Sequence, residues 1–137
     1  MAVPYLACMA LVAQLYALPP RVLPSIQAVE GGAPGVVSRN ANGSEDLGVM
    51  QINSLWIGPL ARYTRLDGST VRERLIARPC FNIAAAGAIL RFYLDEAGGH
   101  LMRAVGNYHS HTPPLHESYV VKVLGAATRL FVREPGR

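Results

Sequence analysis

A chain of 137 residues is long enough for one domain with a single substantial hydrophobic core. Half of its residues are hydrophobic and only 16% are charged, which excludes a disordered, highly charged tail. The formal net charge is +4, and the basic residues are scattered along the chain instead of forming a run. This balance favours an anionic polymer or surface as a neighbour. Because no motif of nucleic-acid-binding proteins accompanies it, we expect no nucleic-acid partner.

The first 18 residues are apolar, as an export signal or a membrane segment would be. No stretch of the chain reaches the roughly 18 to 20 uninterrupted apolar residues of a membrane span, so we predict no stable span. The segment lacks a basic start and is interrupted by Gln14 and Tyr16, unlike a secretory signal peptide. Helical spacing of its apolar residues predicts instead that residues 5–17 form the first helix. We therefore expect any export signal to be separate from these residues or absent.

The second predicted helix runs to Glu30. Apolar positions in residues 20–30 fall three and four apart, and Glu30 follows Ile26 by four residues, so its side chain should project from the apolar face. Gly31 and Gly32 then stop the helix. Burial and the negative end of the helix dipole both disfavour the charged carboxylate, so we expect a raised pKa that suits a general acid. Taken alone, a solvated glutamate at a helix end is the simpler interpretation.

A small hairpin follows this helix. Residues 36–39 and 47–52 are predicted as its strands, and residues 40–44 contain Asn-Gly, a strong hairpin-turn signal. Asp46 lies on the returning side, just before Gly48, where the missing side chain lets backbone or ligand approach closely.

Glu30 and Asp46 are two carboxylates carried by different elements, which is what the cleavage of a glycosidic bond needs. An aspartate beside a turn is also commonly a turn-capping acceptor, so both roles stay open for Asp46.

The rest of the chain is predicted to be helical. Asn53 or Ser54 should cap a helix that begins at Leu55 and Trp56, where Trp56 either packs in the core or stacks on a ligand. The later predicted helices cover residues 70–77, begun by Ser69, then 81–97, 101–108 and 117–133. Small residues at 84–88 of the long apolar helix should allow a close helix contact, which makes it the core helix. The predicted fold is a mainly helical, single α+β domain over residues 1–137.

Two further groups of residues are ambiguous or unpromising. Cys8 and Cys80 are either ordinary buried thiols or one disulfide that closes a long loop in an oxidising compartment. His109, His111 and His116 lie near one another in sequence, but the pattern of a metal site is missing, so we expect a solvated loop and no metal.

Several motifs together carry a family resemblance. Glu30-Gly31-Gly32, followed by Gly48-Val49-Met50-Gln51-Ile52-Asn53, resembles the signature of the lysozyme-like lytic transglycosylases. The likeness is strongest to the small specialised members that accompany secretion, conjugation and pilus machines. It extends over nearly the whole chain, through Cys8 with Tyr16-Ala17-Leu18-Pro19-Pro20, Cys80-Phe81-Asn82-Ile83, Ala104-Val105-Gly106-Asn107-Tyr108 and the helix from Tyr119 to Val123.

The resemblance implies a lysozyme-like fold and a role for each motif. Glu30 would protonate the glycosidic oxygen between N-acetylmuramic acid and N-acetylglucosamine, and would then act as base on the muramyl 6-hydroxyl. Peptidoglycan would be the substrate, a 1,6-anhydro sugar the product, and no cofactor would be needed. The implied substrate contacts are Gly48, Met50, Gln51, Asn53, Trp56 and Tyr108. The two cysteines would form a disulfide in a periplasmic or secreted enzyme that we expect to be monomeric.

The chain also departs from the family pattern. The family usually has Ser after the catalytic Glu, whereas this chain has Gly31, and its late Tyr-Asn appears here as Tyr108-His109. Residues 39–56 are in addition similar to the hairpin of animal-type lysozymes, in which the Asp at the position of Asp46 is the second catalytic carboxylate. The alternatives are therefore a hydrolytic muramidase that uses Glu30 and Asp46 together, or a peptidoglycan-binding module that has lost activity.

Overall fold

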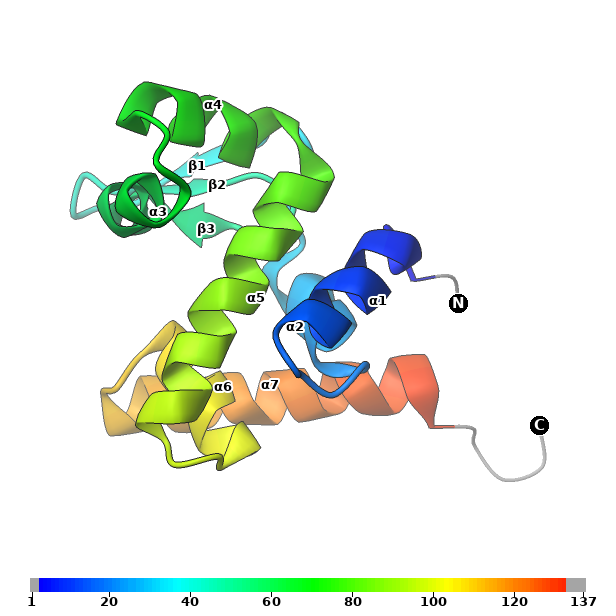
Figure 1. The fold of residues 1–137 in the computed structure, drawn as a ribbon. Helices are drawn as coiled ribbons and strands as arrows, with labels where there is room; N and C mark the ends of the chain where they lie inside the picture. The colour runs from blue at the N-terminus through cyan, green and yellow to red at the C-terminus, as the bar shows by residue number, and fades with distance from the viewer. Residues whose placement is uncertain (1–2, 133–137) are drawn as a thin grey trace. The chain divides into compact units, whose positions relative to one another are not determined.

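The structure is a computed structural model that describes residues 3–132 (Figure 1). The described residues form helices and a small sheet, so the predicted α+β class is confirmed. In chain order the elements are α1 (Leu6–Leu15), α2 (Val22–Glu30), β1 (Val37–Arg39), β2 (Glu45–Leu47), β3 (Ile52–Asn53), the 3-10 helix η1 (Ser54–Trp56), α3 (Ile57–Thr64), α4 (Gly68–Ala77), α5 (Pro79–Glu96), α6 (Leu101–His109) and α7 (Pro113–Phe131).

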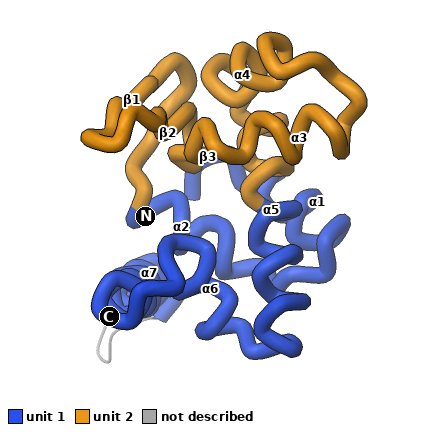
Figure 2. The backbone as a smooth tube through the Cα atoms, turned by 90° about the vertical axis from the view of Figure 1, so that its left-hand side faces the viewer, with its two compact units in different colours: residues 1–29, 87–137 blue, residues 30–86 orange. Residues whose placement is uncertain are grey.

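The chain divides into two compact units (Figure 2). Residues 30–86 hold the sheet with η1, α3, α4 and the first part of α5, and we call them the sheet unit. Residues 1–29 and 87–137 hold the remaining helices, and we call them the helical unit. Glu30, the last residue of α2, belongs to the sheet unit. That the whole chain acts as a single domain stays a prediction.

In the helical unit, α1 and α5 pack closely. A Cβ atom added to Gly87 would lie 2.3 Å from the side chain of Val12 and 3.1 Å from that of Tyr16. The close contact predicted for the small residues of the long helix is therefore confirmed at Gly87. The predicted first helix is also confirmed: α1 buries Met9, Val12 and Ala13 on one face.

Both cysteines of the chain, Cys8 and Cys80, are disulfide-bonded. This settles the choice between thiols and a disulfide that the sequence left open. A bond between these positions closes a loop of about 70 residues, for which chain entropy predicts a stabilisation of about 4 kcal/mol.

We therefore expect no free thiol in the unreduced protein, and a clear fall of the urea unfolding midpoint after reduction. Thiol titration and urea unfolding measure these two quantities. A variant with serine at both positions should unfold like the reduced wild type, and two titratable thiols in the unreduced protein would contradict the disulfide.

The sheet unit contains three antiparallel strands in the order β1-β2-β3, which is one strand more than the two of the predicted hairpin. The predicted strand over residues 47–52 is wrong, because residues 48–51 form a turn between β2 and β3. Gly48 (φ +69°) and Gln51 (φ +52°) both adopt left-handed backbone conformations, and the amide of Gln51 donates to the carbonyl of Gly48 at 3.1 Å. An extended strand cannot pass through two such residues.

Helix α4 begins one residue before the predicted Ser69. Its N-cap is Asp67, whose carboxylate accepts hydrogen bonds from the Thr70 amide at 2.7 Å and from the Ser69 hydroxyl at 2.9 Å. These bonds, chiefly the one from the Thr70 backbone, hold the pKa of Asp67 below its usual value.

Helix α7 begins at Pro113, four residues earlier than predicted. The first helical positions have no intrahelical partner for their backbone amides, so prolines start a helix there without losing a hydrogen bond. The predicted end at residue 133 lies outside the described residues.

Between residues 3 and 132 no single helix is long and apolar enough to cross a membrane. Within the same residues, α4 and α5 together have the length and composition of a span, but they are bent by 110° at the break between them.

Candidate active site

Glu30 lies at the end of α2, as predicted, and is partly exposed. Leu23 and Ile26, seven and four residues earlier, are fully buried on the same helix. The helix ends at Glu30, and the φ of +67° at the following Gly31 favours glycine over the serine of the family pattern.

The chain after Glu30 runs against the turn formed by residues 48–51. A Cβ atom added to Gly32 would lie 2.0 Å from the carbonyl oxygen of Gly48 and 2.8 Å from that of Val49. Only a glycine permits this approach of two backbones. The contact places the segment that follows Glu30 beside the turn that carries the family motif.

Asp46 lies on β2, paired with Ser38 of β1 and with Asn53 of β3. One carboxylate oxygen of Asp46 accepts a hydrogen bond from the Asn53 amide nitrogen at 3.0 Å. The same nitrogen donates to the Ser44 hydroxyl at 3.0 Å, and the Asn53 side-chain oxygen accepts from the Leu55 amide at 2.9 Å. The predicted cap is therefore Asn53. Because both protons of its amide are used inside the protein, Asn53 orients Asp46 instead of offering a donor to a ligand.

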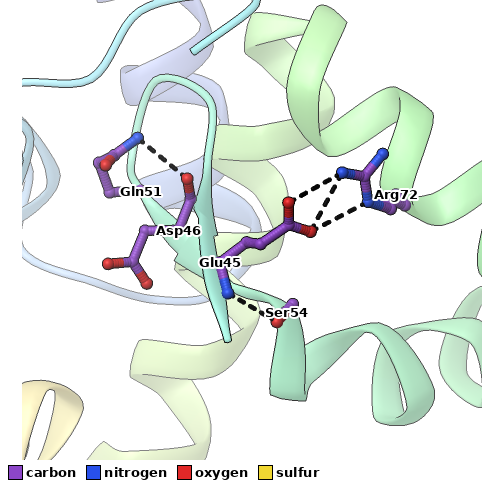
Figure 3. Close-up of polar contacts among 5 residues, drawn as sticks. All are labelled: Glu45, Asp46, Gln51, Ser54 and Arg72. Carbon is purple, nitrogen blue, oxygen red and sulfur yellow. Dashed lines mark hydrogen bonds and ion pairs between the residues drawn. The ribbon is translucent and has the colours of Figure 1, made fainter. Parts of the chain in front are cut away.

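The neighbouring carboxylate, Glu45, points to the opposite side of β2 (Figure 3). It binds Arg72 of α4, with the Arg72 Nη2 atom 3.0 and 3.1 Å from its two oxygens, and its backbone amide donates to the Ser54 hydroxyl at 3.0 Å. Successive side chains of a strand alternate between the two faces, which explains why adjacent acids have separate surroundings. Glu45 joins β2 to α4, whereas Asp46 lies on the other face.

Within the turn, only the side chain of Gln51 is partly exposed. Its amide nitrogen donates to the Gly48 carbonyl at 3.0 Å and makes a longer contact of 3.5 Å with the Asp46 carbonyl (Figure 3). Gly48 is buried and the Met50 side chain is fully buried. The predicted substrate contact of the Met50 side chain is therefore corrected: this side chain packs in the core of the sheet unit.

Two aromatic residues were also predicted to contact substrate. Trp56 ends η1 in the sheet unit and is partly exposed, so its ring is not a fully buried core group. Tyr108 lies on α6 in the helical unit, where its ring stacks on Tyr119 with centroids 6.5 Å apart. The structure therefore gathers Glu30, Asp46, Gln51 and Trp56 in one unit, and Tyr108 in the other.

Of the three histidines, His109 ends α6, His116 lies on α7 and only His111 is in the loop between them, so the predicted loop is wrong for His109 and His116. His111 lies 2.7 Å from a carboxylate oxygen of Glu96, and His109 stacks on Tyr119 with centroids 4.5 Å apart. Among residues 3–132 no three acidic, histidine or cysteine side chains are grouped so that they could hold a metal ion.

Asn82 was named above only as part of a family motif and was given no role, whereas the structure joins it to the turn. Its amide oxygen accepts a hydrogen bond from the Met50 backbone amide at 2.8 Å. Its amide nitrogen donates to the carbonyls of Leu47 and Leu75, each at 2.8 Å. The available signal was one amide among the apolar residues of the long helix, because a polar group at a core position must find partners.

Comparisons with known proteins identify one family and several relatives. The family described as "Transglycosylase SLT domain" matches residues 8–117. The chain is 34% identical over 82 residues, 59% of its length, to "Invasion protein IagB" of Salmonella typhimurium (strain SL1344). It is 30% identical over 119 residues, 86% of its length and 74% of the relative's, to "Protein IpgF" of Shigella flexneri. The match spans about half of the Salmonella protein, 47% of its length.

Proposed function

Because this chain belongs to the family of transglycosylase SLT domains, which matches residues 8–117, we propose that it is a peptidoglycan lytic transglycosylase. The bond cleaved is the β-1,4 bond between N-acetylmuramic acid and N-acetylglucosamine, and the product is a 1,6-anhydro sugar. The observation that carries the proposal is the contact between Gly32 and the carbonyls of Gly48 and Val49. It brings the segment that follows Glu30 against the turn that carries Gln51, which supports a single site built from the two parts of the family signature.

In the proposed reaction, Glu30 acts first as acid and then as base. Its proton goes to the glycosidic oxygen as the bond from this oxygen to C1 of the muramyl ring breaks. The resulting carboxylate then takes the proton of the 6-hydroxyl while that oxygen bonds to C1. Glu30 returns to its starting state and no water is consumed. The partly exposed Gln51 and Trp56 are proposed to contact the sugars, together with Tyr108.

A hydrolytic muramidase is the second candidate, and the surroundings of Asp46 favour it. The Asn53 amide holds this carboxylate at 3.0 Å, on the face of β2 opposite Glu45. A carboxylate oriented in this way at the proposed site would stabilise the positive charge of the oxocarbenium-like transition state.

The two reactions differ by one water in their products, so mass spectrometry of fragments released from purified peptidoglycan distinguishes them. Fragments that end in 1,6-anhydro-muramic acid support the transglycosylase. Reducing ends, heavier by one water, would replace it with the hydrolase. If glycan binds and no fragment is released, the chain is a binding module, the third alternative.

Asp46→Asn tests the second carboxylate. The substitution keeps the size of the side chain and removes its charge, so we expect a rate loss of roughly 100-fold or more in a hydrolase, and a smaller loss in a transglycosylase. Fragment release from peptidoglycan measures this loss.

Glu45→Gln is the matched control, because Glu45 lies next to Asp46 but binds Arg72 on the other face of the strand. It should leave the rate close to that of the wild type. An unchanged rate for Asp46→Asn would leave Asp46 with a role in the turn only.

We place the proposed activity in the periplasm, where the enzyme would open the wall locally for a secretion, conjugation or pilus apparatus. The disulfide fits an oxidising compartment. The name of the Salmonella relative, an invasion protein, fits a role at the cell envelope.

A further inference from the structure

We propose that Asn82 is a positioning residue: its buried amide fixes the turn formed by residues 48–51 and thereby sets the place of Gln51 at the proposed sugar-binding site. The catalytic part of this inference rests on the proposed function. The structural part concerns the turn alone and is tested separately below.

Asn82 is fully buried on α5, and both ends of its amide are used. The oxygen accepts from the amide of Met50 within the turn, and the nitrogen donates to the carbonyl of Leu47 just before it. The second donor bond goes to Leu75, near the end of α4. One side chain therefore ties both sides of the turn to a helix, with three bonds of 2.8 Å.

The turn needs such a support because its backbone is not in a relaxed strand conformation. Gln51 has a φ of +52°, which costs free energy for a residue with a side chain. Conformations of this kind persist only where the surrounding structure holds them. Met50 lies in the turn between β2 and β3, outside both strands, and Asn82 supplies a partner for its amide.

The same amide also forms part of the surface on which the turn rests. A Cβ atom at Gly48 would lie 2.6 Å from the Asn82 nitrogen and 2.1 Å from the Leu75 carbonyl oxygen. The turn is therefore packed against Asn82 as well as bonded to it. Because the Gln51 amide nitrogen donates to the Gly48 carbonyl, a shift of the turn moves the Gln51 side chain with it.

The test compares Asn82→Asp and Asn82→Ser with Ile83→Val in the full chain with its disulfide intact. Ile83 is the next residue of α5, is equally buried, and has a side chain that cannot form hydrogen bonds, so it controls for lost core packing. Fragment release from peptidoglycan is measured between pH 5 and 8, well below the unfolding temperature of each variant. Hydrogen exchange of the Met50 amide is measured by NMR.

Asn82→Asp should lose roughly 10- to 100-fold in kcat, as expected for a small displacement of a side chain that contacts the substrate, here Gln51. An ionised carboxylate has no donor for the carbonyls of Leu47 and Leu75, whereas a protonated one restores a single donor. The loss should therefore diminish as the pH falls, a change that Ile83→Val does not show. Met50 exchange should accelerate in Asn82→Ser, whose shorter side chain withdraws the acceptor, and stay slow in Ile83→Val; the carboxylate of Asn82→Asp can still accept from the Met50 amide.

Wild-type rates with unchanged Met50 exchange in the Asn82 variants would overturn the proposal. The proposal would also fail if the Asn82 variants and Ile83→Val, compared at the same loss in free energy of unfolding, lost the same amount of activity. Should neither Asn82 variant fold, fast exchange of Met50 in the wild type would still contradict it. If the wild type releases no fragments, the proposed function fails. The positioning role is then judged from two NMR measurements: the exchange of the Met50 amide, and the shift of the Gln51 side-chain amide signal when a chitooligosaccharide is added.

Discussion

Glu30→Gln is expected to abolish the release of fragments from peptidoglycan while the protein stays folded and still binds the glycan. Glutamine has nearly the shape of glutamate but carries no carboxyl proton, so the leaving oxygen is no longer protonated. General acid–base catalysis contributes roughly 10²- to 10⁴-fold, and a residue that serves as both acid and base should lie at the upper end of this range. Fragment release, glycan binding and the thermal midpoint are the quantities to measure.

The stability of this variant should change little. Glu30 is partly exposed, and substitutions at such positions usually change the free energy of unfolding by no more than about 0.5 kcal/mol. Glu73→Gln on α4 is the matched control, because Glu73 is an exposed glutamate of the same unit. Fragment release at the wild-type rate from Glu30→Gln would remove Glu30 as the acid and leave Asp46 as the remaining carboxylate of the predicted pair.

Gly48→Ala is expected to destabilise the sheet unit by more than about 3 kcal/mol. Part of this cost comes from the left-handed backbone, for which a side chain costs about 1 to 2 kcal/mol. The larger part comes from overlap, because the new Cβ would lie 2.1 Å from the Leu75 carbonyl oxygen, a backbone atom that cannot move without shifting the end of α4. Urea unfolding with the disulfide intact measures the loss.

Gly43→Ala separates the two contributions. Gly43 has a φ of +86°, and nothing lies within 4 Å of the position of its missing Cβ. This variant should therefore show only the backbone cost, about 1 to 2 kcal/mol. If the two variants were equally stable, the close packing between the turn and α4 would be contradicted.

Much of the fold could be predicted from local pattern. The spacing of apolar residues located α1, α2, α5 and α6, and the two glycines after Glu30 marked the end of α2. The errors lie where tertiary packing overrides the local sequence pattern. The strand predicted over residues 47–52 ends after Leu47, because the chain turns at Gly48 to pack against α4.

The candidate site was predictable in its residue types and less so in their roles. The motif identified Gln51 and Met50 together, yet one side chain is partly exposed and the other is fully buried. Asn53 was expected to face a ligand, but pairing with β2 places its amide on Asp46. Alternation along a strand predicts opposite faces, but it does not say which face receives a partner.

The sequence by itself therefore determined the family, the helices and the position of Glu30 at a helix end next to two glycines, because these depend on residues close together in the chain. Only the tertiary structure decided which residues hold the turn. The bond between Asn82 and Met50 joins residues 32 positions apart, and the one between Asn82 and Leu47 spans 35. Such bonds depend on which side of α5 meets the turn after folding. A buried amide must find hydrogen-bond partners, but the sequence does not reveal where in the chain those partners lie.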